Sequence, residues 1–164
     1  MILIEPTIQA RFGRRLRLRT LSGFLESASA AAKLRGEVSV LLTGDAPIRR
    51  LNRQFRHKDT PTDVLSFPAL DVSGDQSLAG DLAISVETAA RQAEDRGHAL
   101  AVELQILMLH GLLHLAGYDH EQDSGQMARR EATLRRRLGL SQGLIERSGG
   151  GSPVRSQRRG VRQP

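Results

Sequence analysis

The sequence predicts an α+β domain: a small mixed four-stranded sheet with helices packed on it and a central apolar helix that carries two histidines, with a third in the turn after it. Short aliphatic runs bounded by glycine, proline and polar residues indicate the strands, and longer segments with helical periodicity lie between them. The segment 100–116 is apolar almost all round, which is typical of a helix buried in the core.

The length of the chain and its charge distribution predict one domain followed by a tail. A chain of 164 residues is long enough for one well-packed core. The net charge is +6, but residues 148–164 hold four arginines and no acid, so residues 1–147 carry 20 basic against 18 acidic side chains. We therefore expect a mildly basic domain over 1–147 and a disordered basic tail over 148–164.

The first half of the chain predicts two strands and two helices. Residues 1–4 read as a short strand ended by a proline. Apolar side chains at helical spacing predict a helix over 9–33. A glycine then ends that helix, and the apolar run 37–42 predicts the second strand. A proline at its first position opens the helix predicted for 47–55.

The second half predicts two more strands and three helices. The third strand covers 62–67 and is stopped by a proline, and the fourth covers 82–85. A serine can cap the polar helix over 86–96. The apolar helix 100–116 follows, and an amphipathic helix over 124–138 completes the predicted domain.

Three histidines of the apolar helix and the turn after it form the candidate metal site. His110 and His114 are four residues apart, which places both imidazoles on one helix face. Gly117 supplies a residue suited to end the helix, so that His120 can point back into the same space. Three protein ligands leave a fourth position open for water or substrate, which is the arrangement of catalytic zinc. Hydrolysis is therefore the expected chemistry.

The same histidine spacing occurs in metzincin proteases, where a glutamate directly after the first histidine acts as general base. In this chain that position is Gly111. Because the proton acceptor of peptide hydrolysis is missing, a substrate other than a peptide is favoured.

Composition restricts the setting of the protein. The chain has no cysteine, which excludes disulfides and thiolate ligands and fits a reducing cytosol. We see no apolar run of membrane-spanning length and no signal peptide, so we expect a soluble cytoplasmic protein without membrane contact. The excess of arginine permits a polyanionic partner such as RNA.

Three separate motifs, taken together and in order, resemble the YbeY family of bacterial rRNA maturation endoribonucleases. They are the segments 51–68, 80–84 and 110–120, the last of which reads His-Gly-Leu-Leu-His-Leu-Ala-Gly-Tyr-Asp-His. The resemblance covers roughly residues 1–140, including Glu131 in the last predicted helix, and leaves out the tail.

The resemblance implies a single-strand-specific, metal-dependent endoribonuclease that matures the 3′ end of small-subunit rRNA and takes part in ribosome quality control. It implies that His110, His114 and His120 hold one zinc ion, and that Arg56 is a further residue needed for activity. We therefore take Arg56 and His110 as the catalytic candidates. The implied partners are single-stranded rRNA, the ribosome or its small subunit, and ribosomal or GTPase proteins.

The residues themselves leave the mechanism open. A guanidinium at position 56, which we place on a polar loop, can clamp a phosphate and stabilise its charge during cleavage. The nucleophile is either metal-activated water or the ribose 2′-OH. Asp63, Asp81 and Asp119 are possible proton acceptors, although a structural role is favoured for each.

Two other functions are compatible with the motif. One is a metzincin-like metallopeptidase, which the histidine spacing favours and Gly111 argues against. The other is a ribosome-assembly factor without catalytic activity, in which the metal only fastens the helix to the following loop.

Overall fold

The computed structural model describes residues 1–70, 74 and 76–149. This part of the chain forms one four-stranded sheet, seven α-helices and a 3₁₀ helix. The strands are β1 (Ile2–Ile4), β2 (Glu37–Thr43), β3 (Val64–Pro68) and β4 (Leu78–Ser85). The helices are α1 (Pro6–Phe12), η1 (Gly13–Leu16), α2 (Leu18–Ala31), α3 (Asp45–Arg56), α4 (Val86–Arg96), α5 (Leu100–Leu115), α6 (Gln126–Arg137) and α7 (Leu144–Gly149).

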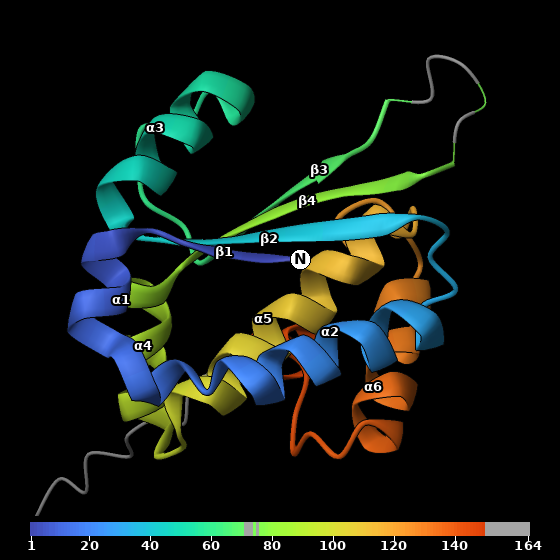
Figure 1. Ribbon diagram of the computed structural model, residues 1–164. Coiled ribbons are helices and arrows are strands. Elements are labelled where there is room, and N and C mark those ends of the chain that lie inside the picture. Colours follow the sequence, from blue (N-terminus) through green and yellow to red (C-terminus); the bar gives the residue numbers. More distant parts are fainter. Residues whose placement is uncertain (71–73, 75, 150–164) are drawn as a thin grey trace, which may run out of the picture.

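The sheet is mixed, as the sequence predicted. Its strand order is β1-β2-β4-β3, in which β1, β2 and β4 run parallel and β3 pairs antiparallel with β4. In Figure 1, α2, α5 and α6 lie on one side of the sheet and α3 lies on the other. The strand order makes β3 an edge strand, and β3 packs against α5.

Helix α5 is central, which confirms the prediction from its composition. Twelve of its sixteen residues are buried, and it packs against β3, β4, α2 and α4. A separate small cluster on the opposite face of the sheet joins α3 to β3 and β4 through Ile48, Leu65 and Ala83. Helix α3 is thus held on one face of the sheet, and α5 is held on the other.

The single helix predicted for 9–33 is wrong, because the chain breaks there. Arg17 adopts a left-handed conformation with φ 49°, which separates η1 from α2. In one continuous helix, Phe12 and Leu16 would lie about half a turn away from Leu21 and Leu25, since each residue advances about 100°. All four side chains are buried in the structure, so the break lets both faces reach the core.

Other boundaries also differ from the predictions. Strand β4 begins at Leu78 rather than at 82, because pairing with β2 and β3 holds residues 78–81 in the sheet although they do not form an apolar run. Helix α3 runs from Asp45 to Arg56, so Arg56 ends a helix instead of lying in a loop. Helix α7 was not predicted, and it extends past residue 147. Residues 150–164 of the predicted tail lie outside the described residues.

No single helix in the described ranges is long and apolar enough to cross a membrane. By length and composition alone, α4 and α5 taken together meet the requirements for a broken membrane span, with a bend of 114° between them.

The burial of α5 gives a testable prediction about stability. Replacing Leu107, which is fully buried in α5, by alanine should lower the free energy of unfolding by about 2–5 kcal/mol, because a cavity is left in a packed core. The control is Leu3→Ala on β1, where the side chain is 48% exposed and the loss should be much smaller. Urea denaturation followed by circular dichroism measures both, and equal losses would contradict the central position of α5.

Candidate functional site

The end of α5 brings the three predicted histidines together. Gly117, with φ 97°, closes the helix: its N–H donates to the His114 carbonyl at 3.0 Å, and the Tyr118 N–H donates to the Leu113 carbonyl at 3.1 Å. The chain then turns back over the last turn of α5. One nitrogen from each of His110, His114 and His120 lies within 4.8 Å of the others, so the three can hold a metal ion.

The outer nitrogens of two histidines are engaged by acceptors. His110 Nδ1 lies 2.9 Å from Oε2 of Glu131 on α6, and both side chains are buried. His114 Nδ1 lies 3.0 Å from the backbone oxygen of Tyr118. A carboxylate or carbonyl behind Nδ1 places the proton on that nitrogen and leaves Nε2 as a lone-pair donor for a metal. Histidines that ligate metals are oriented in this way.

The separation of the inner nitrogens, the Nε2 atoms, shows whether a metal ion fits between them. The Nε2 atoms of His110 and His114 are 3.1 Å apart. With both Nδ1 atoms facing acceptors, two lone pairs point at each other, which is unfavourable unless a cation lies between them. One ion bonded at about 2.0–2.1 Å to each nitrogen spans such a separation. The donor set therefore fits a metal ion that prefers nitrogen ligands.

His114 does not readily become the cation itself by taking up a proton. Burial lowers the pKa of His114, and the neighbouring His110 lowers it further, while the hydrogen bond to the Tyr118 carbonyl acts in the opposite direction. The net effect is a pKa below the ordinary value of histidine, so His114 is kept neutral and available as a ligand.

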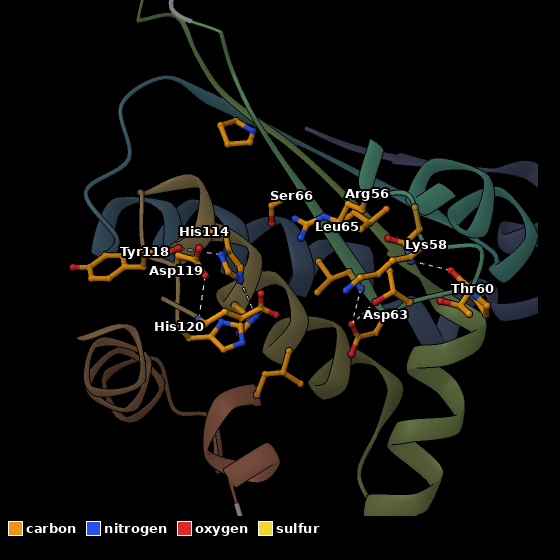
Figure 2. Close-up of a pocket in the computed structure, with 18 of the residues that line it drawn as sticks. Arg56, Lys58, Thr60, Asp63, Leu65, Ser66, His114, Tyr118, Asp119 and His120 are labelled. Carbon is orange, nitrogen blue, oxygen red and sulfur yellow. Dashed lines mark hydrogen bonds between the residues drawn. The ribbon is translucent and has the colours of Figure 1, made fainter. Parts of the chain in front are cut away.

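The histidines form one wall of a pocket of about 620 Å³. The other wall comes from the end of α3, the loop after it and the edge strand β3. Figure 2 shows Arg56 and Lys58 on one side of the pocket, His114 and His120 on the other, and Ser66 of β3 between them. Arg56 and His110 are 54 positions apart in the sequence, and the structure brings both to this pocket.

Arg56 is exposed, and no hydrogen bond or ion pair of its guanidinium is found among the residues that the structure describes. By contrast Arg49, two turns earlier on α3, forms an ion pair with Asp59 at 2.8 Å. The pocket therefore presents an unpaired cation beside the candidate metal ligands, which suits an anionic group.

The structure explains why position 111 has no catalytic carboxylate. Gly111 lies against the sheet, and a Cβ atom there would come 2.8 Å from Leu82 Cδ2 and 3.3 Å from Ser66 Oγ. The Ser66 hydroxyl donates to the Gly111 carbonyl at 3.2 Å. A glutamate at this position would meet the sheet instead of the pocket, so the close packing of α5 on β3 and β4 excludes it.

The three aspartates considered as proton acceptors are placed differently. Asp63 lines the pocket, but its Oδ1 accepts from the Val64 N–H at 2.8 Å and its Oδ2 from Gln92 Nε2 at 3.3 Å. Asp119 also lines the pocket, and its Oδ1 accepts from the Glu121 N–H at 3.1 Å. Asp81 is exposed on β4 and is not among the residues that line the pocket.

Sequence reasoning included Glu131 in the resemblance but gave it no role. A signal was present in the sequence: Met127, Glu131 and Leu134 share one face of α6, and all three are buried. An acid in line with apolar residues on a helix face needs a buried partner. Its partner is His110.

Comparison with known proteins identifies relatives of the chain. The family model described as "Endoribonuclease YbeY" matches residues 8–139. A protein with that name from Koribacter versatilis is 53% identical over 130 residues, which are 79% of this chain and 83% of the relative. Another from Solibacter usitatus is 50% identical over 145 residues, covering 88% of this chain and 86% of the relative.

A solved structure also resembles the chain. The solution structure of a protein from Thermotoga maritima superposes with a TM-score of 0.53 at 28% sequence identity. The match covers 96% of this chain and all of the other.

The contact between Glu131 and His110 gives a second prediction. Glu131→Gln should weaken binding of a divalent metal roughly 10–100-fold, because the amide no longer fixes the proton on Nδ1 of His110. Glu26→Gln, at an exposed position on α2, is the control and should bind as the parent protein does. Competition with a chromophoric chelator measures the affinities, and an unchanged value for Glu131→Gln would show that the contact does not orient a ligand.

Proposed function

This chain belongs to the endoribonuclease YbeY family, and on that premise we propose that its histidine pocket cleaves single-stranded RNA with the help of one zinc ion. The observation that carries the proposal is the shared pocket, in which three converging histidines face the unpaired guanidinium of Arg56. Histidine ligands alone accept several divalent metals. All three candidate ligands are nitrogen atoms, and the separation of the His110 and His114 Nε2 atoms suits tetrahedral coordination. Both features support zinc.

In this proposal the three histidines bind the metal ion and Arg56 binds the phosphate. His110, His114 and His120 hold the ion, with His110 fixed from behind by Glu131. When bound, the ion supplies Lewis-acid chemistry to a phosphoryl oxygen or to water. Arg56 clamps a non-bridging phosphate oxygen and stabilises the negative charge that grows there as the phosphodiester bond is attacked.

The two cations on the α3 side of the pocket support RNA over a peptide as substrate, while the acidic residues Asp63, Asp119 and Glu121 line other parts of it. Arg56 and Lys58 both line it, and each adds a positive charge next to the ligands. Each nucleotide of RNA brings one phosphate, whereas a peptide backbone brings none. Gly111 in addition removes the glutamate with which a metzincin cleaves peptides. These two features argue against the metallopeptidase alternative.

We propose the 3′ end of small-subunit rRNA as the substrate, with cleavage in the cytoplasm during ribosome assembly and quality control. The family resemblance supports this assignment. The chain is poor in aromatic residues, at 3%, so stacking of bases contributes little selectivity. The ribosomal subunit or a bound ribosomal or GTPase protein would then present the correct single strand to the pocket.

The role of Arg56 is tested by its removal. Arg56→Ala should lower the rate of cleavage of a single-stranded RNA spanning an rRNA 3′ end by roughly 10²–10³-fold, because charge on the phosphate is no longer stabilised. Metal affinity and the unfolding midpoint should stay unchanged, since Arg56 is exposed. Arg53→Ala, one turn earlier on α3 and outside the pocket, is the control and should keep activity.

Three other outcomes would decide against parts of the proposal. Full activity of Arg56→Ala would remove the phosphate clamp. Cleavage of casein but not of RNA by the metal-loaded protein would favour the peptidase. Binding of small ribosomal subunits without cleavage of either substrate would favour the assembly factor.

A further inference from the structure

We propose that a C-terminal clasp, residues 143–147, positions the metal ligand His110 by holding Glu131, and that Arg147 is the residue that fastens the clasp. The inference deepens the proposed function and rests on it. The clasp lies beyond residue 139, where the match to the family model ends.

The first contact of the clasp is made by its backbone. The Ile145 N–H donates to Oε1 of Glu131 at 2.8 Å, and Oε2 of the same carboxylate faces His110 Nδ1 at 2.9 Å. Glu131 is fully buried, so water does not compete for either oxygen. With one oxygen held by the clasp and the other by the imidazole, the plane of the carboxylate is fixed and the orientation of the His110 ring with it.

Gly143 allows this approach. A Cβ atom at that position would come 2.8 Å from Cδ of Glu131 and closer still to its Oε1. A side chain at 143 would push the clasp away from the carboxylate and break the Ile145 contact. Leu144, the next residue, lines the pocket itself, so the clasp also forms part of its wall.

Arg147 fastens the other end of the clasp to α5. Its guanidinium forms a two-pronged ion pair with Glu103, in which Nη1 lies 2.9 Å from Oε2 and Nη2 contacts Oε1. The side chains are 4% and 0% exposed, and His98 Nε2 lies 2.6 Å from Oε2 as well. Burial raises the pKa of Glu103, but the hydrogen bonds from Arg147 and His98 outweigh it and hold the pKa below its usual value.

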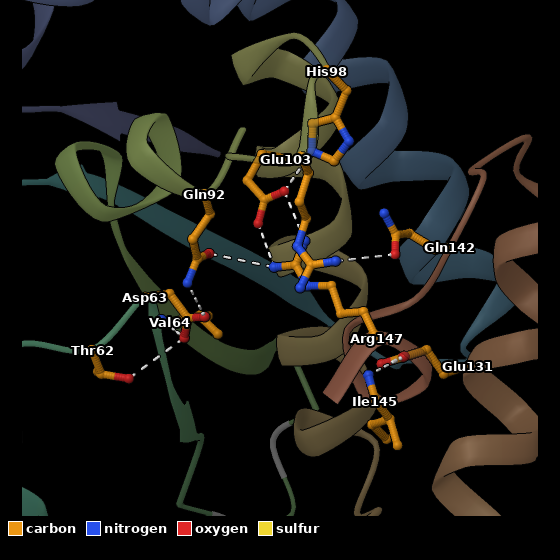
Figure 3. A network of polar contacts seen from close by, with 11 residues as sticks. Thr62, Asp63, Val64, Gln92, His98, Glu103, Glu131, Gln142, Ile145 and Arg147 are labelled. Atoms are coloured by element: carbon orange, nitrogen blue, oxygen red, sulfur yellow. Dashed lines mark hydrogen bonds and ion pairs between the residues drawn. The ribbon is translucent and has the colours of Figure 1, made fainter. Parts of the chain in front are cut away.

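The same guanidinium reaches a second wall of the pocket. Arg147 Nη2 donates to Gln92 Oε1 at 3.3 Å, and Gln92 Nε2 donates to Asp63 Oδ2 at 3.3 Å. Figure 3 follows these contacts from Glu103 through Arg147 and Gln92 to Asp63, with Ile145 and Glu131 beside them. One buried arginine thereby fixes groups on both sides of the pocket, which a helix that only covered the core would not need.

A buried ion pair adds little net stability over apolar side chains of similar volume, and in this proposal it defines the geometry of the site instead. This distinction separates the proposal from a simpler one, in which α7 only stabilises the fold. If the clasp is a positioning element, its loss should alter the metal site more than it alters unfolding. If it only stabilises, unfolding should change and the metal site should not.

The first experiment removes the Ile145 donor in the full chain. Ile145→Pro deletes the N–H at a position in the first turn of α7, where no intrahelical bond is lost. Ile145→Val keeps the N–H and is the control. Cobalt(II) is the probe, because its visible absorption reports the ligand geometry. We expect Ile145→Pro to bind cobalt about tenfold more weakly with a changed spectrum, and Ile145→Val to match the parent protein.

The second experiment replaces the ion pair by apolar groups of similar volume. The double variant Glu103→Leu/Arg147→Met should unfold at a temperature no lower than the parent protein, since such replacements are often neutral or stabilising. It should nevertheless show the weaker cobalt binding of Ile145→Pro. It decides the question alone if the proline variant does not fold. Parent-like cobalt affinity and spectrum in the folded variants would overturn the proposal.

The readout also separates this proposal from the proposed function. Cobalt affinity does not depend on RNA, so a parent protein that binds cobalt but cleaves no RNA would refute the nuclease and leave the clasp standing. In an active parent, loss of the clasp should lower kcat more than it raises KM, because it disturbs His110 and leaves Arg56 and Lys58 on the α3 side of the pocket in place.

Discussion

The site depends on the two imidazole nitrogens that face each other at 3.1 Å at the end of α5. Each is turned inward because an acceptor holds the opposite side of its ring: the Glu131 carboxylate for His110 and the Tyr118 carbonyl for His114. Two lone pairs at this separation repel each other unless a proton or a metal ion lies between them. The fold therefore has to bring α5, α6 and the turn after Gly117 together, and the packing of the core serves that arrangement.

Close packing of α5 under the sheet restricts the chemistry of the pocket. Gly111 allows β4 and β3 to approach the helix, and this contact leaves no room for a carboxylate beside His110. The edge strand β3 and the end of α3 then form the wall opposite the histidines and bring Arg56 to it. The result is a pocket in which Arg56 and Lys58 lie opposite three histidines that can hold a metal ion, which matches a phosphodiester better than a peptide bond.

Local sequence patterns predicted the parts of the site that depend on local geometry. The spacing of His110 and His114 and the glycine at 117 place three imidazoles together because a helix repeats every 3.6 residues. The opposite helical phases of Phe12 and Leu21 also indicate the break at Arg17, because one continuous helix over 9–33 would not bury both side chains. The contacts between Glu131 and His110 and between Arg147 and Glu103 join residues 21 and 44 positions apart. No local pattern specifies such partners, because tertiary packing decides them.

The most direct test is stoichiometric reconstitution of the metal-free protein with zinc while cleavage of single-stranded RNA is followed and the product ends are identified. Activity should rise in proportion to added zinc and level off at one ion per chain, and His114→Ala should stay inactive at every ratio. A cyclic phosphate end would assign the attack to the ribose 2′-OH, and its absence would assign it to water. Cleavage that is complete before zinc is added, or equal in His114→Ala, would contradict a metal-dependent nuclease at these histidines.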